Sequence, residues 1–121
     1  MISFNGNAAI KSKYAQIAKD HYDLDNFRQN NGYCRNGKVC ALGCYHNTDS
    51  QEACIQKNID ILGIPDNLSL LEEVIFERSS FAYAQTFPLR FLESIPVGVA
   101  LSRLDIQIKK FILQERLKTI N

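Results

Sequence analysis

The chain has 121 residues, of which 45% are hydrophobic and 22% are charged. These values are ordinary for a globular protein and argue against extended disorder. The 14 basic and 13 acidic residues nearly cancel, so no overall positive charge is present to attract the phosphates of a nucleic acid. The length predicts one compact domain over residues 1–121.

Apolar runs in the sequence are all short. None approaches the roughly 20 residues that are needed to span a bilayer, and the first residues lack a secretory-length apolar stretch. We therefore expect a soluble cytoplasmic protein, and delivery into a host cell by another route stays open. In the cytoplasm the four cysteines are expected to be reduced.

The first predicted helix covers residues 8–27. Its apolar positions recur at alternating spacings of four and three, which is typical of one helix face. They are Ile10, Tyr14, Ile17 and Leu24, with His21 in the same stripe. Asn7 is the expected N-cap. We interpret His21 as a histidine at the edge of the core, bonded to backbone or a carboxylate, rather than as a catalytic group.

A short β-hairpin is predicted near residues 33–40. The dipeptide Asn36-Gly37 stands between two short β-prone segments, which indicates a two-residue turn. The expected register pairs Arg35 with Lys38 and Cys34 with Val39. Cys34 and Cys40 are therefore not opposite one another, which disfavours a local disulfide.

Further helices are expected after the hairpin. Thr48 or Asp49 is the predicted N-cap of the next one, and Gly63 ends it. A central helix then covers roughly residues 65–79. Its apolar positions are Leu68, Leu71, Val74, Ile75 and Phe76.

The last third of the chain should contain an aromatic turn and a short helix, with Pro88 breaking or restarting the chain between them. A final helix from Leu101 to about Ile120 is apolar on more than one side. It is either wrapped by its neighbours or a surface for a dimer or partner. The fold class expected is therefore all-α, a single compact helical domain of about five helices with one short β-hairpin.

Four sequence blocks carry a resemblance: FNGNAAIKSKY, NGKVCALGC, LGIPDNLSLLEEVIFE and FPLRFLESIPVG. They resemble an uncharacterised family of small bacterial and phage-encoded proteins, over about residues 3–104. Members are similar in carrying a Gly-Lys-Gly-Cys-Ala-Val-Gly-Cys block with a nearby histidine, then Leu-Gly-Ile-Pro, Ile-Phe-Glu and Ile-Pro-x-Gly-Ala-Asp-Leu. The resemblance implies no activity. It places Cys40 and Cys44 on the family's two cysteines, whereas Cys34 and Cys54 have no counterpart and His46 lies one position early.

The cysteine block admits three interpretations. Cys40, Cys44, His46 and Cys54 could bind a structural zinc ion, although only Cys40 and Cys44 have the usual pair spacing. Alternatively, Cys40 is a reactive thiol at the start of a helical turn, with His46 as its base or Cys44 as its redox partner. We favour the third interpretation, in which the thiols pack as small hydrophobic groups and no cofactor is bound.

The charged residues of the sequence indicate a functional site less clearly than the cysteines do. Glu73 and Glu77 are one helical turn apart and could share a metal or a proton, but no Glu-x-x-His motif accompanies them. We interpret both of them and Glu72 as solvated or capping carboxylates. The Lys and Arg side chains of the last predicted helix are too sparse to predict contact with a nucleic acid. They are Lys109, Lys110, Arg116 and Lys118.

The function favoured by these patterns is that of a non-enzymatic accessory or host-interaction factor that binds a macromolecule. Its expected partner is another protein, or a second copy through the C-terminal helix. The first alternative is a cysteine-dependent enzyme or thiol-redox protein that uses Cys40 with Cys44 or His46. The second is a structural zinc-binding module.

Overall fold

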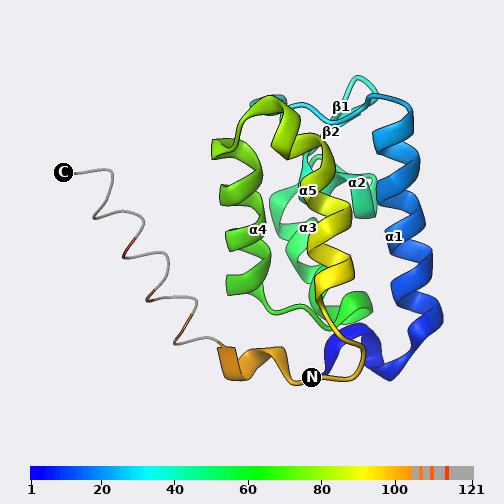
Figure 1. The fold of residues 1–121 in the computed structure, drawn as a ribbon, viewed down its shortest axis with the longest axis vertical. Helices are drawn as coiled ribbons and strands as arrows, with labels where there is room; N and C mark the ends of the chain where they lie inside the picture. The colour runs from blue at the N-terminus through cyan, green and yellow to red at the C-terminus, as the bar shows by residue number, and fades with distance from the viewer. Residues whose placement is uncertain (105–106, 108–109, 111–113, 115–121) are drawn as a thin grey trace.

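A computed structural model describes residues 1–104, 107, 110 and 114. Five α-helices lie in this part of the chain: α1 (Ala8–Asp23), α2 (Ala41–His46), α3 (Gln51–Lys57), α4 (Asp66–Arg78) and α5 (Phe81–Ser94). Three short helical turns accompany them: η1 (Ser3–Gly6), η2 (Asn58–Leu62) and η3 (Leu101–Leu104). In the bundle α1 and α4 flank α5, while α2 and α3 lie behind it (Figure 1). The predicted all-α class is confirmed.

Helix α1 begins as the sequence predicts. The Asn7 side chain accepts a hydrogen bond of 2.9 Å from the backbone N–H of Ala9, which satisfies one of the free donors at the helix start. The helix ends at Asp23, four residues before the expected boundary, because Asp25 adopts a left-handed backbone with φ of 56°.

The hairpin has the predicted register. Strand β1 (Cys34–Arg35) pairs antiparallel with β2 (Lys38–Val39), and Cys34 lies opposite Val39. Asp49 holds this hairpin from outside, since its carboxylate accepts from the Tyr33 N–H at 2.8 Å and from the Arg35 guanidinium at 2.8 Å.

The prediction that Thr48 or Asp49 is the N-cap of helix α3 was wrong. Ser50 caps the helix instead, with its hydroxyl accepting a 3.2 Å hydrogen bond from the N–H of Ala53. Asp49 is engaged by the hairpin, and the Thr48 hydroxyl accepts from the Ser50 N–H. The helix continues into the π-helical turn η2, which ends as predicted at Gly63, where φ is 61°.

The expected break at Pro88 was also wrong, because α5 runs through it without interruption. A proline inside a helix removes one backbone hydrogen bond. Here Pro88 is fully buried, and α5 packs against α1 and against α4, which keeps the helix continuous.

The N-terminus and the segment that follows α5 meet at the lower end of the bundle in Figure 1. Ser3 donates its N–H to the Val99 carbonyl at 2.8 Å and accepts at its own carbonyl from the Gly98 N–H at 3.0 Å. The predicted helix from Leu101 to about Ile120 falls mostly outside the described residues. No helix among those described is long and apolar enough to cross a membrane.

Candidate functional site

The cysteine block lies on and around α2, the most deeply buried of the described helices. All six of its residues are buried, and Cys40 is its N-cap, with its sulfur accepting a 3.3 Å hydrogen bond from the Gly43 N–H. The glycine allows the hairpin to cross directly above: a Cβ at Gly43 would lie 1.5 Å from the Tyr33 carbonyl oxygen. That carbonyl also accepts from the Cys40 N–H at 3.1 Å. The block is thus a packed junction between helix and hairpin.

The thiol of Cys40 is engaged by the carboxyl group of Glu73 rather than by His46, the base expected from the sequence. Its Sγ donates to Oε2 of Glu73 over 3.3 Å, and the Leu42 N–H donates to the same oxygen at 3.3 Å. Burial, and then the negative charge of Glu73, raise the pKa of Cys40 far above its ordinary value. A nucleophilic cysteine requires the opposite shift, because the thiolate is the reactive form. This geometry stabilises a neutral thiol.

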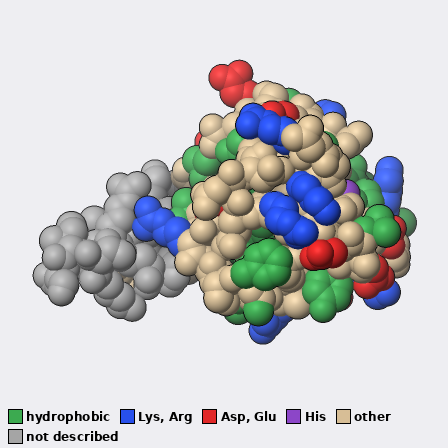
Figure 2. All heavy atoms as spheres, turned by 90° about the horizontal axis from the view of Figure 1, so that it is seen from above, with side chains coloured by type: hydrophobic (Ala, Val, Ile, Leu, Met, Phe, Trp, Pro, Cys, Tyr) green, Lys and Arg blue, Asp and Glu red, His purple; other side chains and the backbone are tan. Residues whose placement is uncertain are grey.

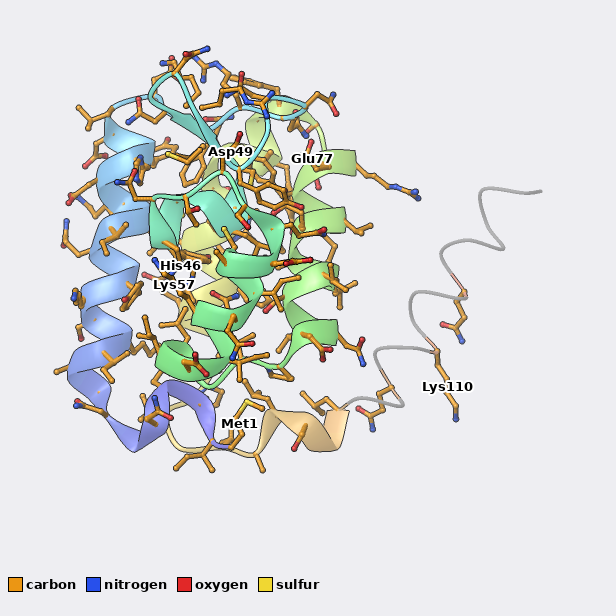
Figure 3. All side chains as sticks on the ribbon, turned by 180° about the vertical axis from the view of Figure 1, so that it is seen from behind. Met1, His46, Asp49, Lys57, Glu77 and Lys110 are labelled. Atoms are coloured by element: carbon orange, nitrogen blue, oxygen red, sulfur yellow. The ribbon has the colours of Figure 1, made fainter. Side chains whose placement is uncertain are left out.

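His46 and Cys44 make separate contacts. His46 Nε2 lies 2.5 Å from Oδ1 of Asn58, whose Nδ2 donates to the Ser69 hydroxyl at 2.9 Å. Burial lowers the pKa of His46, so the ring is neutral and donates to Asn58. Cys44 donates to the Ala41 carbonyl at 3.2 Å, and its pKa is raised by burial. In Figure 3 His46 lies near the middle of the bundle, away from the hairpin end.

The remaining two thiols point to the turn after α2. Cys34 Sγ donates to the Asn47 side-chain oxygen at 3.3 Å, and Cys54 Sγ lies 3.6 Å from the Thr48 carbonyl. All four cysteines are free thiols. Within the described residues, no three His, Cys, Asp or Glu side chains are placed to hold one metal ion.

Glu72 and Glu73 lie beneath the cysteine block, so the expectation that they are solvated was wrong. The alternative expectation, a capping carboxylate, fits Glu73, which accepts from the Leu42 N–H in the first turn of α2. Glu72 is 0% exposed and Glu73 is 9% exposed. Glu72 lies one turn from both Leu68 and Phe76, which are buried on the same face of α4. That spacing is a signal in the sequence that could have placed Glu72 in the core.

Glu72 is held as a neutral acid by this environment. Burial raises its pKa well above the ordinary value, and among the described residues its Oε1 has no hydrogen-bond partner. Its Oε2 lies 2.6 Å from the Tyr45 hydroxyl, which lies 3.0 Å from the Pro88 carbonyl. The Tyr45 hydroxyl has one proton, and the Pro88 carbonyl can only accept it. The neutral acid of Glu72 therefore donates to Tyr45, and Tyr45 donates to Pro88. This chain of hydrogen bonds joins α4, α2 and α5.

Replacing Tyr45 by Phe should destabilise the protein by about 1–3 kcal/mol, because it leaves a buried acid without its partner. Urea unfolding of the variant measures this loss. Tyr22→Phe removes a hydroxyl from a tyrosine that is 46% exposed and should leave the midpoint unchanged. Equal midpoints for Tyr45→Phe and the wild type would show that the hydrogen-bond chain contributes nothing.

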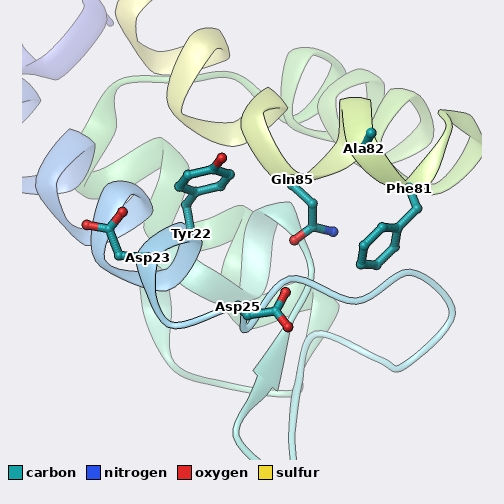
Figure 4. Close-up of a pocket in the computed structure, with 6 residues that line it drawn as sticks. All are labelled: Tyr22, Asp23, Asp25, Phe81, Ala82 and Gln85. Carbon is teal, nitrogen blue, oxygen red and sulfur yellow. The ribbon is translucent and has the colours of Figure 1, made fainter.

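An open pocket lies at the hairpin end of the bundle, between the end of α1 and the start of α5. Its volume is about 500 Å³, and Figure 4 shows the residues that line it: Tyr22, Asp23, Asp25, Phe81, Ala82 and Gln85. The Arg28 guanidinium lies 5.7 Å from the Phe81 ring centre and hydrogen-bonds to Asp25 at 3.2 Å. Sequence reasoning missed this pocket, because its two walls are distant in the chain and no local motif marks it.

The chain matches no protein-family model, no curated protein and no solved structure. The resemblance to small bacterial and phage-encoded proteins stays a prediction.

Proposed function

We propose that the protein acts by binding a segment of another protein in the pocket between α1 and α5. The observation that carries this proposal is the exposure of the two aromatic side chains that line the pocket, Tyr22 at 46% and Phe81 at 54%. Leu24, which lies between the lining residues Asp23 and Asp25 in the sequence, is 69% exposed. Apolar side chains gathered at a surface and bordered by polar groups are typical of interaction sites. The view from above shows hydrophobic side chains beside basic and acidic ones at this end (Figure 2).

The chemistry of the walls indicates the kind of segment that would bind. The pocket walls already hold one cation, because the Arg28 guanidinium lies against the Phe81 ring and hydrogen-bonds to the Asp25 carboxylate. Tyr22 and Asp23 add a second aromatic ring and carboxylate on α1, although the Asp23 carboxylate also pairs with Lys19 at 3.3 Å. A partner segment with an Arg or Lys next to an apolar side chain complements both features. We expect the carboxylates and aromatic rings of the pocket to favour a basic and apolar peptide over an acidic one.

Two short peptides test this proposal: blocked Leu-Arg-Phe and its counterpart Leu-Glu-Phe. In an NMR titration, the Arg peptide should shift the amide signals of Tyr22, Asp25 and Gln85, and the Glu peptide should shift them less. Phe81→Ala should abolish the shifts. Val74→Ala, at a site on α4 that is 43% exposed, is the matched control and should bind normally. Equal shifts with both peptides, or full binding by Phe81→Ala, would refute the proposal.

The alternatives from the sequence stay predictions with their own tests. A cysteine-dependent enzyme using Cys40 requires a reactive thiol, which alkylation measures. A structural zinc module requires one equivalent of metal in protein purified without chelator. Self-association through the C-terminal helix requires a dimer in solution, and a cytoplasmic location requires direct imaging. No geometry among the described residues favours any of these over peptide binding.

A further inference from the structure

Arg28 places its guanidinium on two of the residues that line the pocket between α1 and α5. Its Nη1 and Nη2 donate to Oδ1 and Oδ2 of Asp25 at 3.3 and 3.2 Å. The guanidinium carbon lies 5.7 Å from the centre of the Phe81 ring. Asp25 and Phe81 both line the pocket (Figure 4). The protein therefore holds a guanidinium of its own on groups that a basic ligand would use.

The contacts of Arg28 suit a guanidinium better than an ammonium group. A guanidinium is planar and donates from two nitrogens to one carboxylate, whereas the lysine ammonium is a compact point charge. It is also more weakly hydrated, so it loses less water when it lies against an aromatic ring. The hydrogen bond from Arg28, and then its charge, lower the pKa of Asp25, which is therefore ionised at neutral pH. The same carboxylate and ring would select arginine from a ligand.

The Arg28 side chain can leave this position without disturbing the backbone. The Asp25 side chain is 71% exposed, and an exposed ion pair and an exposed cation–π contact each stabilise a protein only weakly. The side chain also donates to the Phe27 carbonyl at 2.7 Å. The Arg28 backbone is fixed separately, because its N–H donates to the Val39 carbonyl at 2.9 Å. Displacement therefore needs only a rotation of the side chain toward solvent.

We propose that the pocket selects an arginine of the partner segment, and that Arg28 occupies the place of this arginine until the segment binds. This inference rests on the proposed function and narrows its ligand from a basic residue to arginine. The incoming arginine takes over the Asp25 carboxylate and the Phe81 ring, and Arg28 turns outward. The fraction of molecules in which Arg28 has turned outward then limits the apparent affinity for the ligand. Arg28 is thus an intramolecular competitor.

Arg28→Gln tests the competition, because it frees the carboxylate and the ring together. It should tighten the binding of blocked Leu-Arg-Phe about three- to tenfold, as expected from the loss of one exposed ion pair and one exposed cation–π contact. An NMR titration measures the dissociation constants. Lys38→Gln is the matched control, since Lys38 Nζ lies 3.2 Å from the backbone carbonyl oxygen of Asp25. It removes the same charge but leaves Arg28 in place, and it should change the affinity by less than about twofold.

Two small cations separate this inference from the proposed function. N-methylguanidinium is the head group of arginine alone, and methylammonium is that of lysine. Arg28→Gln should bind N-methylguanidinium more tightly than the wild type does, and more tightly than it binds methylammonium, with signal changes at Asp25 and Phe81. If this holds while neither protein binds the peptide, the guanidinium site stands and peptide binding is wrong.

Two results would overturn the inference. One is an Arg28→Gln protein that binds neither the arginine peptide nor N-methylguanidinium better than Lys38→Gln does, because Arg28 would then be a fixed part of the wall. The other is equal binding of Leu-Arg-Phe and Leu-Lys-Phe, which would exclude selection of arginine. Far-UV circular dichroism checks that each variant is folded. If Arg28→Gln is not, Arg28→Lys, which keeps the charge but loses the planar fork, should still tighten binding of the arginine peptide by a smaller factor.

Discussion

Replacing Gly43 by Ala should abolish the native packing of the hairpin and cost about 4 kcal/mol or more of stability. The added Cβ would lie 1.5 Å from the Tyr33 carbonyl oxygen and 2.2 Å from its carbonyl carbon. Both atoms belong to the backbone, so no side-chain rotation relieves the contact. The hairpin must move away, which also breaks the 3.1 Å hydrogen bond from the Cys40 N–H to Tyr33. Thermal unfolding followed by circular dichroism measures the loss.

Gly37→Ala in the same hairpin is the matched control. Its Cβ would meet no atom within 4 Å, and the only penalty is the left-handed backbone at φ of 75°. That penalty is about 1–2 kcal/mol. If Gly43→Ala is no less stable than Gly37→Ala, the close approach of hairpin and α2 is absent from the protein in solution.

The second large effect is a dependence of stability on pH that originates at Glu73. Burial, as the largest cause, raises the pKa of Glu73 from 4.5 to about 7. The folded state therefore holds this proton more tightly than the unfolded state does. The resulting stability is fully present below pH 4.5 and is lost as the pH rises through 7. A shift of this size corresponds to about 3–4 kcal/mol, at about 1.4 kcal/mol per pKa unit.

Glu73→Gln removes this dependence, because the amide cannot ionise and its oxygen can still accept from Cys40 and Leu42. The free energy of unfolding, measured in urea, should exceed that of the wild type by about 3 kcal/mol at pH 8. The two proteins should be nearly equal at pH 4.5. Comparison with the wild type at each pH isolates the contribution of Glu73, since the buried Glu72 has a raised pKa and acts in the same direction, while His21 and His46 have lowered pKa values and act in the opposite direction.

Glu52→Gln, at an exposed carboxylate on α3, is the control for the loss of one negative charge. It should leave the difference in stability between the two pH values unchanged. A Glu73→Gln protein that matches the wild type at both pH values would show that the Glu73 carboxyl is not buried.

The parts of the fold that were predictable from the sequence are those with a local physical signal. Asn7 caps α1 through its own side chain, and Asn36-Gly37 sets the hairpin register by its turn geometry alone. Gly63 ends a helix because it accepts a left-handed backbone. Each depends on a few neighbouring residues and needs no knowledge of the rest of the chain.

The features that were missed depend on contacts between distant segments. Asp49 looks like a helix cap in sequence, but its carboxylate is taken by the hairpin. Pro88 looks like a helix break, but packing on both sides of α5 overrides its local effect. Glu72 looks like a surface residue until Tyr45, from another helix, supplies the partner that allows its burial.

The cysteine block drew attention in the sequence because thiols and imidazole are chemically versatile. In the structure Cys40 contacts Glu73, and His46 contacts Asn58, so the two groups of the predicted catalytic pair have different partners. Their burial assigns the block to the packing of α2 against the hairpin and α4. Binding at the surface pocket then requires no chemistry from these thiols.

Alkylation of the native protein at neutral pH tests most directly whether Cys40 is a buried structural thiol. Cys34, which is partly exposed, should react first, while Cys40, Cys44 and Cys54 should react fully only after unfolding in urea. Mass spectrometry of the digested protein identifies the modified residues. Rapid modification of Cys40 in the folded protein, faster than that of Cys34, would contradict the structural role and favour a cysteine-dependent activity.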